Sequence, residues 1–309
     1  MFLKLIIFVI LLYLIIVLYG RYKHPYWFYH PVDFFYTLSN EEGVIGQPYY
    51  IHNYNRDYRC SRWSNSEEII EFLNENFQPG GGEYLYKNTK KDTIFYKIMN
   101  KKDNYVSGCI SARKVNVILD NKEYIIWYVD HLALKISERN NRIATDLISY
   151  MIKDTGAYVI IFKKDNQPLP FKYFCKYNYY KVLDKSQPEQ PNVVDDISLK
   201  KKYSMYIEPD KGECIFLEKN GCYAIVYYSG ILDSNKKEIY EIAYAENKEM
   251  AQLSVNYLIK KQPNTKILVN ELSGTNLFYK TEYLSTNYLY FYNYRKHIMN
   301  PKDIFICIQ

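Results

Sequence analysis

The sequence lacks the residue patterns that mark disulfide, metal and serine-nucleophile chemistry. Its six cysteines form no C-x-x-C pair and follow no regular spacing, so buried free thiols in a reducing compartment are favoured over disulfides or a zinc site. The histidines show no metal-ligand spacing, and no serine stands in a G-x-S-x-G context. We therefore expect no metal site and no catalytic serine.

The chain also lacks a strong charge of either sign and a low-complexity linker. Its formal net charge of +6 is spread over 309 residues. This mild excess fits an anionic ligand or a membrane surface and is too diffuse to predict nucleic-acid binding. With 48% hydrophobic residues, the chain is long enough for one large domain or two smaller ones.

One uncharged run of membrane-spanning character is present, over residues 5–20 (LIIFVILLYLIIVLYG). As a helix it would span roughly 24 Å, short of the ~30 Å hydrocarbon core of a bilayer. Lys4 and Arg21 can snorkel and residues 1–3 are apolar, so a span is feasible. We predict a transmembrane anchor over residues 1–22.

The alternative for this run is a cleaved signal peptide, which needs a basic leader and a small-residue cleavage site. A single lysine precedes the run, and no A-x-A pattern follows it, so an uncleaved anchor is favoured. Arg21, Lys23 and His24 lie on the C-terminal side. By the positive-inside rule, the rest of the chain is expected to face the cytosol.

The hydrophobic periodicity after the anchor predicts the same order of elements twice: antiparallel strands, a helix and a strand. The first set of expected strands and helices covers 65–77 (helix), 92–99, 104–119, 123–134, 142–153 (helix) and 157–162. The second set covers a hairpin about 219–221, then 238–246, 248–261 (helix) and 265–272. A polar stretch at 185–196 separates the two. We predict an α+β fold with two similar units, 23–184 and 185–309, that share one large, mostly antiparallel mixed sheet.

The chain ends in the apolar run DIFICIQ, residues 303–309. Chain ends usually fray into solvent behind polar residues. Residues 304–308 read instead as a final buried strand, which would carry the α-carboxylate of Gln309 into the interior.

The segment most informative about chemistry is the polar loop ERNN, residues 138–141, between the strand at 123–134 and the helix that begins near Arg142 or Ile143. Free N–H groups at a helix N-terminus bind anions, and Arg139 and Arg142 flank these groups. Phosphate is the natural ligand of such a site. The alternative is a basic loop that is simply solvated.

The pattern Arg139-x-x-Arg142-x-Ala144 resembles the pyrophosphate loop of the GNAT acyltransferase superfamily, usually Arg/Gln-x-x-Gly-x-Gly/Ala. The arginine at the fourth position matches one branch, the glycylpeptide N-tetradecanoyltransferases (N-myristoyltransferases), whose loop reads R-S-K-R-[LV]-A-P. Other segments resemble that family in the same order along the chain: 26–32 (F-W-x-T-Q-P-V), 107–134 (V-G-F-I-S-A to N-F-L-C-V), 168–182 (L-P-K-P-x-x-x-C-R-Y-W-H-R-x-L-N) and 288–294 (Y-Y-L-Y-N-W).

The resemblance implies a GNAT-like fold in each half and myristoyl-CoA as a co-substrate, with no permanently bound cofactor. The acyl-CoA would bind the N-terminal half. The residues implied to contact it are Tyr26, Trp27, Arg139, Asn140, Asn141, Arg142, Ile143 and Ala144. The backbone amides at His131 and Leu132 would polarise the thioester carbonyl. The carboxylate of Gln309 would take the proton from the acceptor's N-terminal glycine ammonium, because a free amine attacks a thioester and an ammonium does not.

Two positions depart from the family. The family's asparagine beside the oxyanion pair corresponds to Asp130, and its Thr-Ala-Gly corresponds to Lys164, Asp165 and Asn166. Both family segments help to hold the acceptor amine. Asp130 could still attract an ammonium, whereas Lys164 would repel it or point away. The segment between the halves is also much shorter than in the family, and an anchor is not part of the usual pattern.

The resulting hypothesis is a membrane-anchored, monomeric N-myristoyltransferase-like enzyme that acts on a Gly-initiated protein or peptide. One alternative is a GNAT-type acyltransferase with another acyl-CoA or amine acceptor. The other is a non-catalytic membrane-tethered scaffold that retains the fold. Simpler interpretations of single features also stand: the aromatic residues 26–36 fit a membrane-interface belt as well as a CoA contact, and His131 and Asp130 fit strand residues with hydrogen-bond partners.

Overall fold

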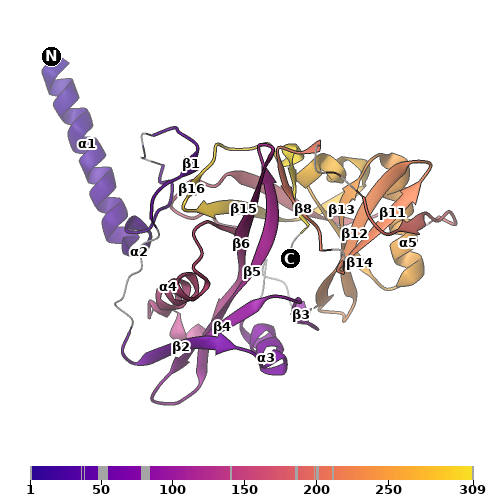
Figure 1. The fold of residues 1–309 in the computed structure, drawn as a ribbon, viewed down its shortest axis with the longest axis horizontal. Coiled ribbons are helices and arrows are strands. Elements are labelled where there is room, and N and C mark those ends of the chain that lie inside the picture. The colour runs from indigo at the N-terminus through magenta and orange to yellow at the C-terminus, as the bar shows by residue number, and fades with distance from the viewer. Residues whose placement is uncertain are drawn as a thin grey trace.

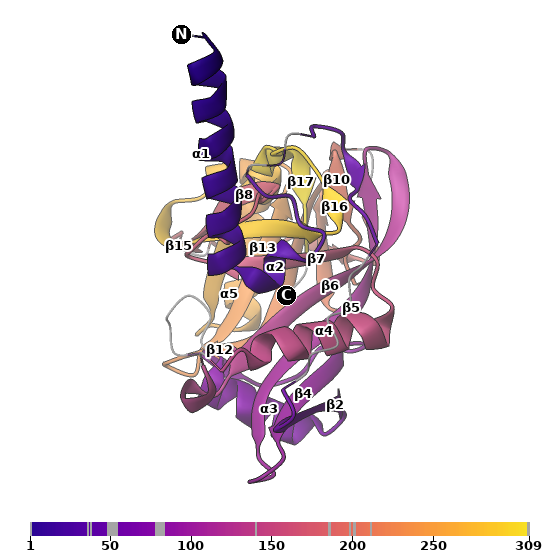
Figure 2. The same ribbon diagram turned by 90° about the vertical axis from the view of Figure 1, so that its left-hand side faces the viewer.

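The N-terminal helix α1 (Phe2–Lys23) stands clear of the rest of the chain in the computed structural model (Figures 1 and 2). The structure describes residues 2–35, 37, 39–47, 55–77, 84–139, 141–184, 187–197, 199, 202–210 and 212–307. With 22 residues, α1 is about 33 Å long, longer than the uncharged run because its flanking residues are also helical. It is the one helix in the described part of the chain that is long and apolar enough to cross a membrane.

The predicted α+β fold is confirmed: a single large mixed sheet runs through the molecule (Figure 1). Its main path orders the strands β17-β10-β5-β6-β7-β15-β8-β14-β13-β12-β11-β9, while β2, β3 and β4 branch from it. A short separate ladder pairs β1 (Gly43–Val44) with β16 (Tyr294–Arg295). Most neighbouring strands are antiparallel, as the sequence predicts.

The first unit is a meander followed by a helix and a parallel strand. Its elements are β2 (Tyr58–Trp63), α3 (Ser66–Asn76), β3 (Tyr84–Tyr86), β4 (Ile94–Asn100), β5 (Val106–Leu119), β6 (Lys122–Leu134), η2 (Ile136–Glu138), α4 (Ile143–Thr155) and β7 (Ile160–Asp165). Asp120 and Asn121 both have positive φ, which makes the tight turn between β5 and β6. Helix α4 packs across β2, β4 and β5, and β7 returns parallel to β6.

The second unit repeats this order. Its elements are β9 (Asn192–Val194), β10 (Met205–Ile207), β11 (Cys214–Lys219), β12 (Cys222–Asp233), β13 (Glu238–Ala245), α5 (Lys248–Lys261), β14 (Lys266–Asn270) and η4 (Leu272–Phe278). The β11–β12–β13 meander is antiparallel, and β14 lies parallel to β13. The meander, helix and parallel strand expected twice from the periodicity therefore both form.

Two long strands join the units by exchange. β8 (Cys175–Val182), which follows the first unit in sequence, pairs with β14 of the second, while β15 (Thr281–Tyr292) pairs with β7 of the first. β8 and β15 also pair with each other. Because each unit is completed by a strand from the other side of the sequence, neither buries its sheet edge alone.

Some local expectations are corrected by the structure. The helix expected at 65–77 begins at Ser66, because Asn65 is the cap of α3 and its side chain accepts hydrogen bonds from the Glu67 and Glu68 amides. Of the predicted final strand at 304–308, only β17 (Ile304–Phe305) pairs, in parallel with β10 after the short turn η5 (Pro301–Asp303). Residues 308 and 309 lie outside the described residues.

Candidate functional site

The strands β6 and β7 separate in the middle of the first unit. Their parallel pairing begins at Trp127 and Ile160 and ends at Val129 and Phe162, although both strands continue beyond those residues. On the other side of β6, His131 and Leu132 together oppose the single residue Ile110 of β5. This bulge turns the end of β6, so the two strands open a groove between them.

A cavity of about 720 Å³ occupies this groove. Its size lies within the usual range for small-molecule sites. Much of the lining is apolar and is supplied by the strands, by α4 and by the loop after β7: Ile110, Val129, Leu134, Ile148, Met151, Ile152, Ile160, Phe162 and Leu169. The shape and lining suit a flexible hydrocarbon chain.

The aromatic residues that follow α1 form one wall of this cavity. Tyr26 and Trp27 belong to the short helix α2 (Pro25–Phe28). The Tyr26 hydroxyl lies 3.3 Å from Ser149 Oγ of α4, and the Trp27 ring packs 5.0 Å from the Phe171 ring. The base of the apolar helix is therefore joined directly to the cavity wall.

The polar loop before α4 is held by a buried carboxylate. Glu138 accepts hydrogen bonds from the Tyr58 hydroxyl at 2.6 Å, from the Tyr105 hydroxyl and from Asn141 Nδ2 at 2.9 Å. Burial would raise the pKa of Glu138, but these hydrogen bonds outweigh burial and lower it. The loop is thus fixed around the protein's own carboxylate, that of Glu138.

The start of α4 is left without a side-chain cap. Arg142 occupies the N-cap position with φ of 60°, and its side chain caps no amide of the first turn. Arg139, Ala144 and Thr145 line the first cavity next to this helix end. Uncapped N–H groups beside an arginine are suited to a phosphate.

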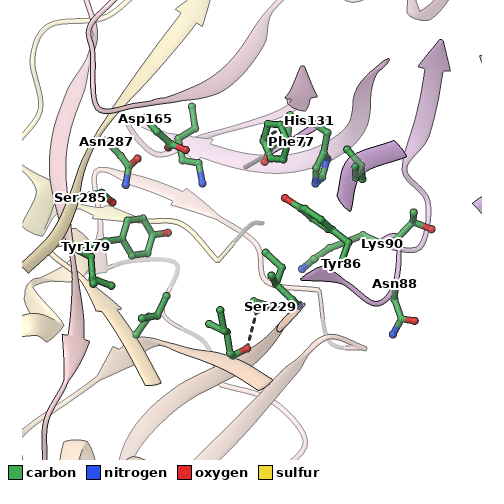
Figure 3. Close-up of a pocket in the computed structure, with 18 of the residues that line it drawn as sticks. Phe77, Tyr86, Asn88, Lys90, His131, Asp165, Tyr179, Ser229, Ser285 and Asn287 are labelled. Atoms are coloured by element: carbon green, nitrogen blue, oxygen red, sulfur yellow. Dashed lines mark hydrogen bonds between the residues drawn. The ribbon is translucent and has the colours of Figure 1, made fainter. Parts of the chain in front are cut away.

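A second cavity, of about 320 Å³, lies between the two units. In Figure 3 the hydroxyl ends of Tyr86 and Tyr179 point toward each other across it, with Asp165, Ser285 and Asn287 on the Tyr179 side and His131 on the Tyr86 side. Asn287 is 2% exposed, and its Oδ1 has no hydrogen-bond partner among the described residues. A buried amide without a partner is an available contact for a polar ligand.

The two cavities meet at a small charged cluster. Phe77, Asp130, Lys163 and Asp165 line both of them. Burial would lower the pKa of Lys163, but Asp165, Tyr128 and Asp130 raise it well above its usual value. Burial would raise the pKa of Asp130, but the charges of His131 and Lys163 lower it. Lys163 is therefore cationic and Asp130 anionic at neutral pH.

The bulge residue His131 is held from several sides. Its backbone has φ of 54°, and its amide donates a 2.7 Å hydrogen bond to Oδ1 of Asp130. Its Nδ1 lies 2.8 Å from Ser111 Oγ, and its ring packs against the rings of Phe77, Tyr86 and Phe95. Burial lowers the pKa of His131, and the charge of Asp130 partly opposes this effect.

The structure brings most of the residues suggested by the sequence to these cavities. Those that line the first cavity are Tyr26, Trp27, Asp130, Leu132, Arg139, Ala144 and Lys164. His131 lines the second cavity, and Asn141 faces a shallow neighbouring hollow. Arg142 is exposed at the helix end, and Ile143 is fully buried beneath it. Asn140 and Gln309 lie outside the described residues.

The sequence reasoning missed Lys163, which occupies the junction, while its neighbour Lys164 lines the first cavity and is largely exposed. A signal was present: side chains alternate along a strand, so Lys163 shares the face of β7 that carries the fully buried Ile161. Tyr179 and Asn287 were also missed, because they reach the second cavity from β8 and β15, far away in sequence.

The last described residues are buried. Cys307 is buried, its Sγ lies 3.2 Å from Sγ of Cys214, and both are free thiols. Burial raises the pKa of the Cys307 thiol, and the charges of Lys90 and Glu241 also act on it. Cys307 lines a further cavity of about 380 Å³, together with Arg113 and Asn116 of β5.

Neither a protein-family model nor a curated protein sequence matches the chain. Solved structures do match. A crystal structure of Saccharomyces cerevisiae N-myristoyltransferase with bound myristoyl-CoA superposes with a TM-score of 0.69 and 12% identity, over 93% of this chain and 99% of that one. Another, with bound myristoyl-CoA and inhibitors, gives a TM-score of 0.66 and 13% identity, over 91% and 92%. The chain therefore has the N-myristoyltransferase fold.

Proposed function

We propose that this chain is an N-myristoyltransferase-like acyltransferase, which moves a myristoyl group from myristoyl-CoA to the N-terminal glycine amine of a protein or peptide. The observation that carries the proposal is the pair of cavities that meet at Asp130, Lys163 and Asp165. A transferase with two substrates needs two sites that open onto one reaction centre. The shared fold with the yeast enzyme supports the same assignment.

In this proposal the acyl-CoA occupies the first cavity. The acyl chain lies between β6 and β7 against α4, where the lining is apolar. The CoA phosphates meet the uncapped start of α4 and the loop around it, with Arg139, Asn140, Asn141, Arg142, Ile143 and Ala144 as the proposed contacts. Tyr26 and Trp27 border the ligand. The Leu132 amide, in the bulge of β6, is the proposed donor to the thioester carbonyl.

The acceptor occupies the second cavity, between the units. Asp130, which carries a lowered pKa, is placed to attract an ammonium group at the junction. Lys164 lines the first cavity, and its Nζ donates to the Asp165 carbonyl, away from the acceptor side. The α-carboxylate of Gln309 is the proposed base that takes a proton from the acceptor ammonium.

Helix α1 is the proposed membrane anchor, with the catalytic part facing the cytosol. Its exposed apolar surface supports a position in the bilayer, and its basic residues Arg21 and Lys23 favour a cytosolic C-terminal end. Arg21 also stacks over the rings of Phe28 and Tyr29, which stabilises the junction with α2.

The direct test is transfer of radiolabelled myristate from myristoyl-CoA by the full chain in detergent micelles. The acceptors are a broad panel of Gly-initiated peptides, and the same peptides with acetylated N-termini are the controls. We expect label on the free peptides alone. No transfer to any peptide of the panel would contradict the proposal.

A matched pair of variants tests the proposed base. One glycine appended after Gln309 displaces the α-carboxylate by about 3.5 Å, so transfer is expected to fall sharply. The same glycine inserted in the exposed turn beside Lys236 is expected to leave transfer unchanged. Equal activity of the two variants would remove Gln309 from the mechanism.

A second candidate is a GNAT-type acyltransferase with another acyl-CoA or another amine. The cation Lys163 at the junction favours it, because a permanent positive charge opposes an incoming ammonium. Competition among acetyl-, octanoyl- and myristoyl-CoA for the first cavity separates the two. Preference for the longest chain supports the first candidate, and preference for a short chain supports the second.

A further inference from the structure

Lys163 lies at the one place where the reacting groups of two substrates would meet. It follows Phe162, the last residue of β7 that pairs with β6, and its side chain lines both cavities. Asp130, the first residue of β6 beyond the pairing, stands in the corresponding position on the neighbouring strand. The junction is therefore built from the first residues after the two strands part.

The ammonium of Lys163 is stabilised by carboxylates that act through space and not by a direct ion pair. Among the described residues it makes no hydrogen bond and no ion pair within 4 Å. Its Nζ lies over the ring of Tyr179, 5.8 Å from the ring centroid. Asp165 and Asp130 act on it through space and keep it protonated. No direct ion pair therefore occupies this partly buried ammonium, so it can interact with negative charge on a ligand.

The bulge of β6 does not supply this reaction centre with both of its amides. The amide of His131 is already committed to Oδ1 of Asp130, at 2.7 Å. Asp130 is anionic, so this hydrogen bond is charge-assisted and strong. Of the two amides that the sequence suggested for polarising a thioester carbonyl, only that of Leu132 remains for the task.

We infer that Lys163 is a catalytic residue, whose ammonium group stabilises the negative charge that develops on the thioester carbonyl oxygen during acyl transfer. This inference rests on the proposed function. A fixed cation aimed at a developing oxyanion in a water-poor site lowers the barrier more than it strengthens substrate binding. Lys163 thereby supplies the oxyanion stabilisation that the His131 amide cannot give, because that amide donates to Asp130.

The step balances as follows. The lone pair of the acceptor amine forms a C–N bond to the thioester carbonyl carbon, and the carbonyl π pair moves onto the oxygen beside Lys163. When the tetrahedral intermediate collapses, this pair re-forms the C=O bond and the C–S bond breaks, with its electrons on sulfur. The nitrogen loses one proton to the base, and the CoA thiolate gains one, which leaves an amide and CoA thiol.

The same cation affects the acceptor before the chemical step. A positive charge near an ammonium lowers the pKa of that ammonium, so more of the acceptor is present as the reactive free amine at neutral pH. Asp130 and Asp165 moderate this repulsion. Loss of Lys163 is thus expected to change both the rate of the chemical step and its pH dependence.

The test compares Lys163→Met and Lys163→Arg with Lys176→Met in the full chain. Lys176 is a matched control, because its Nζ also lies over a tyrosine ring, 5.9 Å from the Tyr288 centroid, but it is exposed and lines neither cavity. We measure kcat, KM for myristoyl-CoA and a Gly-initiated peptide, and the pH profile of kcat/KM. Retained acyl-CoA binding shows that each variant is folded.

For Lys163→Met we expect kcat to fall roughly a hundredfold, as for loss of one oxyanion donor, with KM for myristoyl-CoA changed less than about threefold. The acidic limb of the profile should move to higher pH, because the acceptor ammonium regains its ordinary pKa. Lys163→Arg keeps the charge, so the limb should stay in place while kcat falls. Lys176→Met should match the wild type.

Two results would overturn the inference. One is a kcat for Lys163→Met within about threefold of the wild type. The other is a loss that appears only in KM for the peptide, which would make Lys163 an acceptor-binding group. If Lys163→Met does not fold, Lys163→Gln replaces it, and a kcat within about threefold of the wild type again overturns the inference. A wild-type chain without transferase activity would refute the proposed function instead, and the two failures are thereby distinguished.

Discussion

The parallel strand pairs of the two units both separate at their ends, but among the described residues the space beyond the pairing is open in the first unit and filled in the second. In the first unit, β6 and β7 part after Val129 and Phe162 around the 720 Å³ groove. In the second unit, β13 and β14 pair from Ile239 to Ile242, and β13 then continues beyond β14 while it stays paired with β12. There the space is filled by η4, which packs on both strands.

η4 acts as a plug, and it is held by hydrogen bonds to the part of β13 that no longer pairs with β14. Ser273 Oγ donates to the Ala243 carbonyl at 3.0 Å, and Thr275 Oγ1 accepts from the Ala245 amide at 3.3 Å. The Leu272 amide donates to Asn270 Oδ1. The backbone groups freed by the separation of the strands are satisfied within the chain, so this unit has no vacancy for a ligand there.

The helix starts differ in the same way. Asn247 caps α5, and its side chain accepts a hydrogen bond from the Met250 amide at 2.9 Å. α4 begins at Arg142 with no side-chain cap, next to the first cavity. The comparison teaches that one topology can serve two purposes. The second unit satisfies its own polar groups, whereas the first has no side-chain cap at its helix start, which suits the acyl-CoA binding that we propose.

The largest difference between the two units is expected from charge reversal near the uncapped start of α4. Arg139→Glu should weaken myristoyl-CoA binding by roughly ten- to a hundredfold, since an attraction to phosphate becomes a repulsion. Lys248→Glu is the matched change at the start of α5, and we expect it to leave binding unchanged. Isothermal titration with both variants checks this, and equal effects would show that the two helix starts do not differ in function.

A smaller effect is expected from opening the plug. Thr275 is 1% exposed, and Thr275→Val removes the acceptor of the Ala245 amide while nearly keeping the volume. An unsatisfied buried amide costs about 1–3 kcal/mol, so the free energy of unfolding should fall by that amount. Urea denaturation measures the loss, and acyl-CoA affinity should stay unchanged at temperatures where the variant is folded. A variant that lost acyl-CoA affinity without losing stability would connect η4 to the site.

The smallest effect concerns the helix caps. Asn247→Ala should lower the free energy of unfolding by about 1 kcal/mol, because the first turn of α5 loses its side-chain acceptor. Arg142→Gly should cost nothing at α4, since no cap is lost and glycine tolerates the positive φ. Denaturant midpoints of the two variants test the difference. A greater loss from Arg142→Gly would mean that the start of α4 is stabilised by that side chain after all.

Much of this architecture could be predicted from local sequence. The helix expected at 248–261 has those bounds, and the strand expected at 123–134 begins one residue earlier, because alternation and 3.6-residue periodicity are properties of neighbouring residues. The polar loop at 138–141, with Arg139 and Arg142, could also be recognised in the sequence.

The junction could not be predicted, because it depends on where two strands stop pairing. Nothing in the adjacent lysines at 163 and 164 says which one enters the interior until the register of β7 is known. The same holds for Asn287 and Tyr179, which come to the second cavity through the exchange of β15 and β8 between the units.

The sequence by itself determined the apolar N-terminal helix, the repeated order of strands and helices, and the basic loop before α4, since each follows from the composition and spacing of residues close together in the chain. Only the tertiary structure decided that one strand pair stays open while the other is filled, and that Lys163 stands between the two cavities. The reason is physical: a cavity is the space that packing leaves, and packing is set by contacts between residues far apart in sequence.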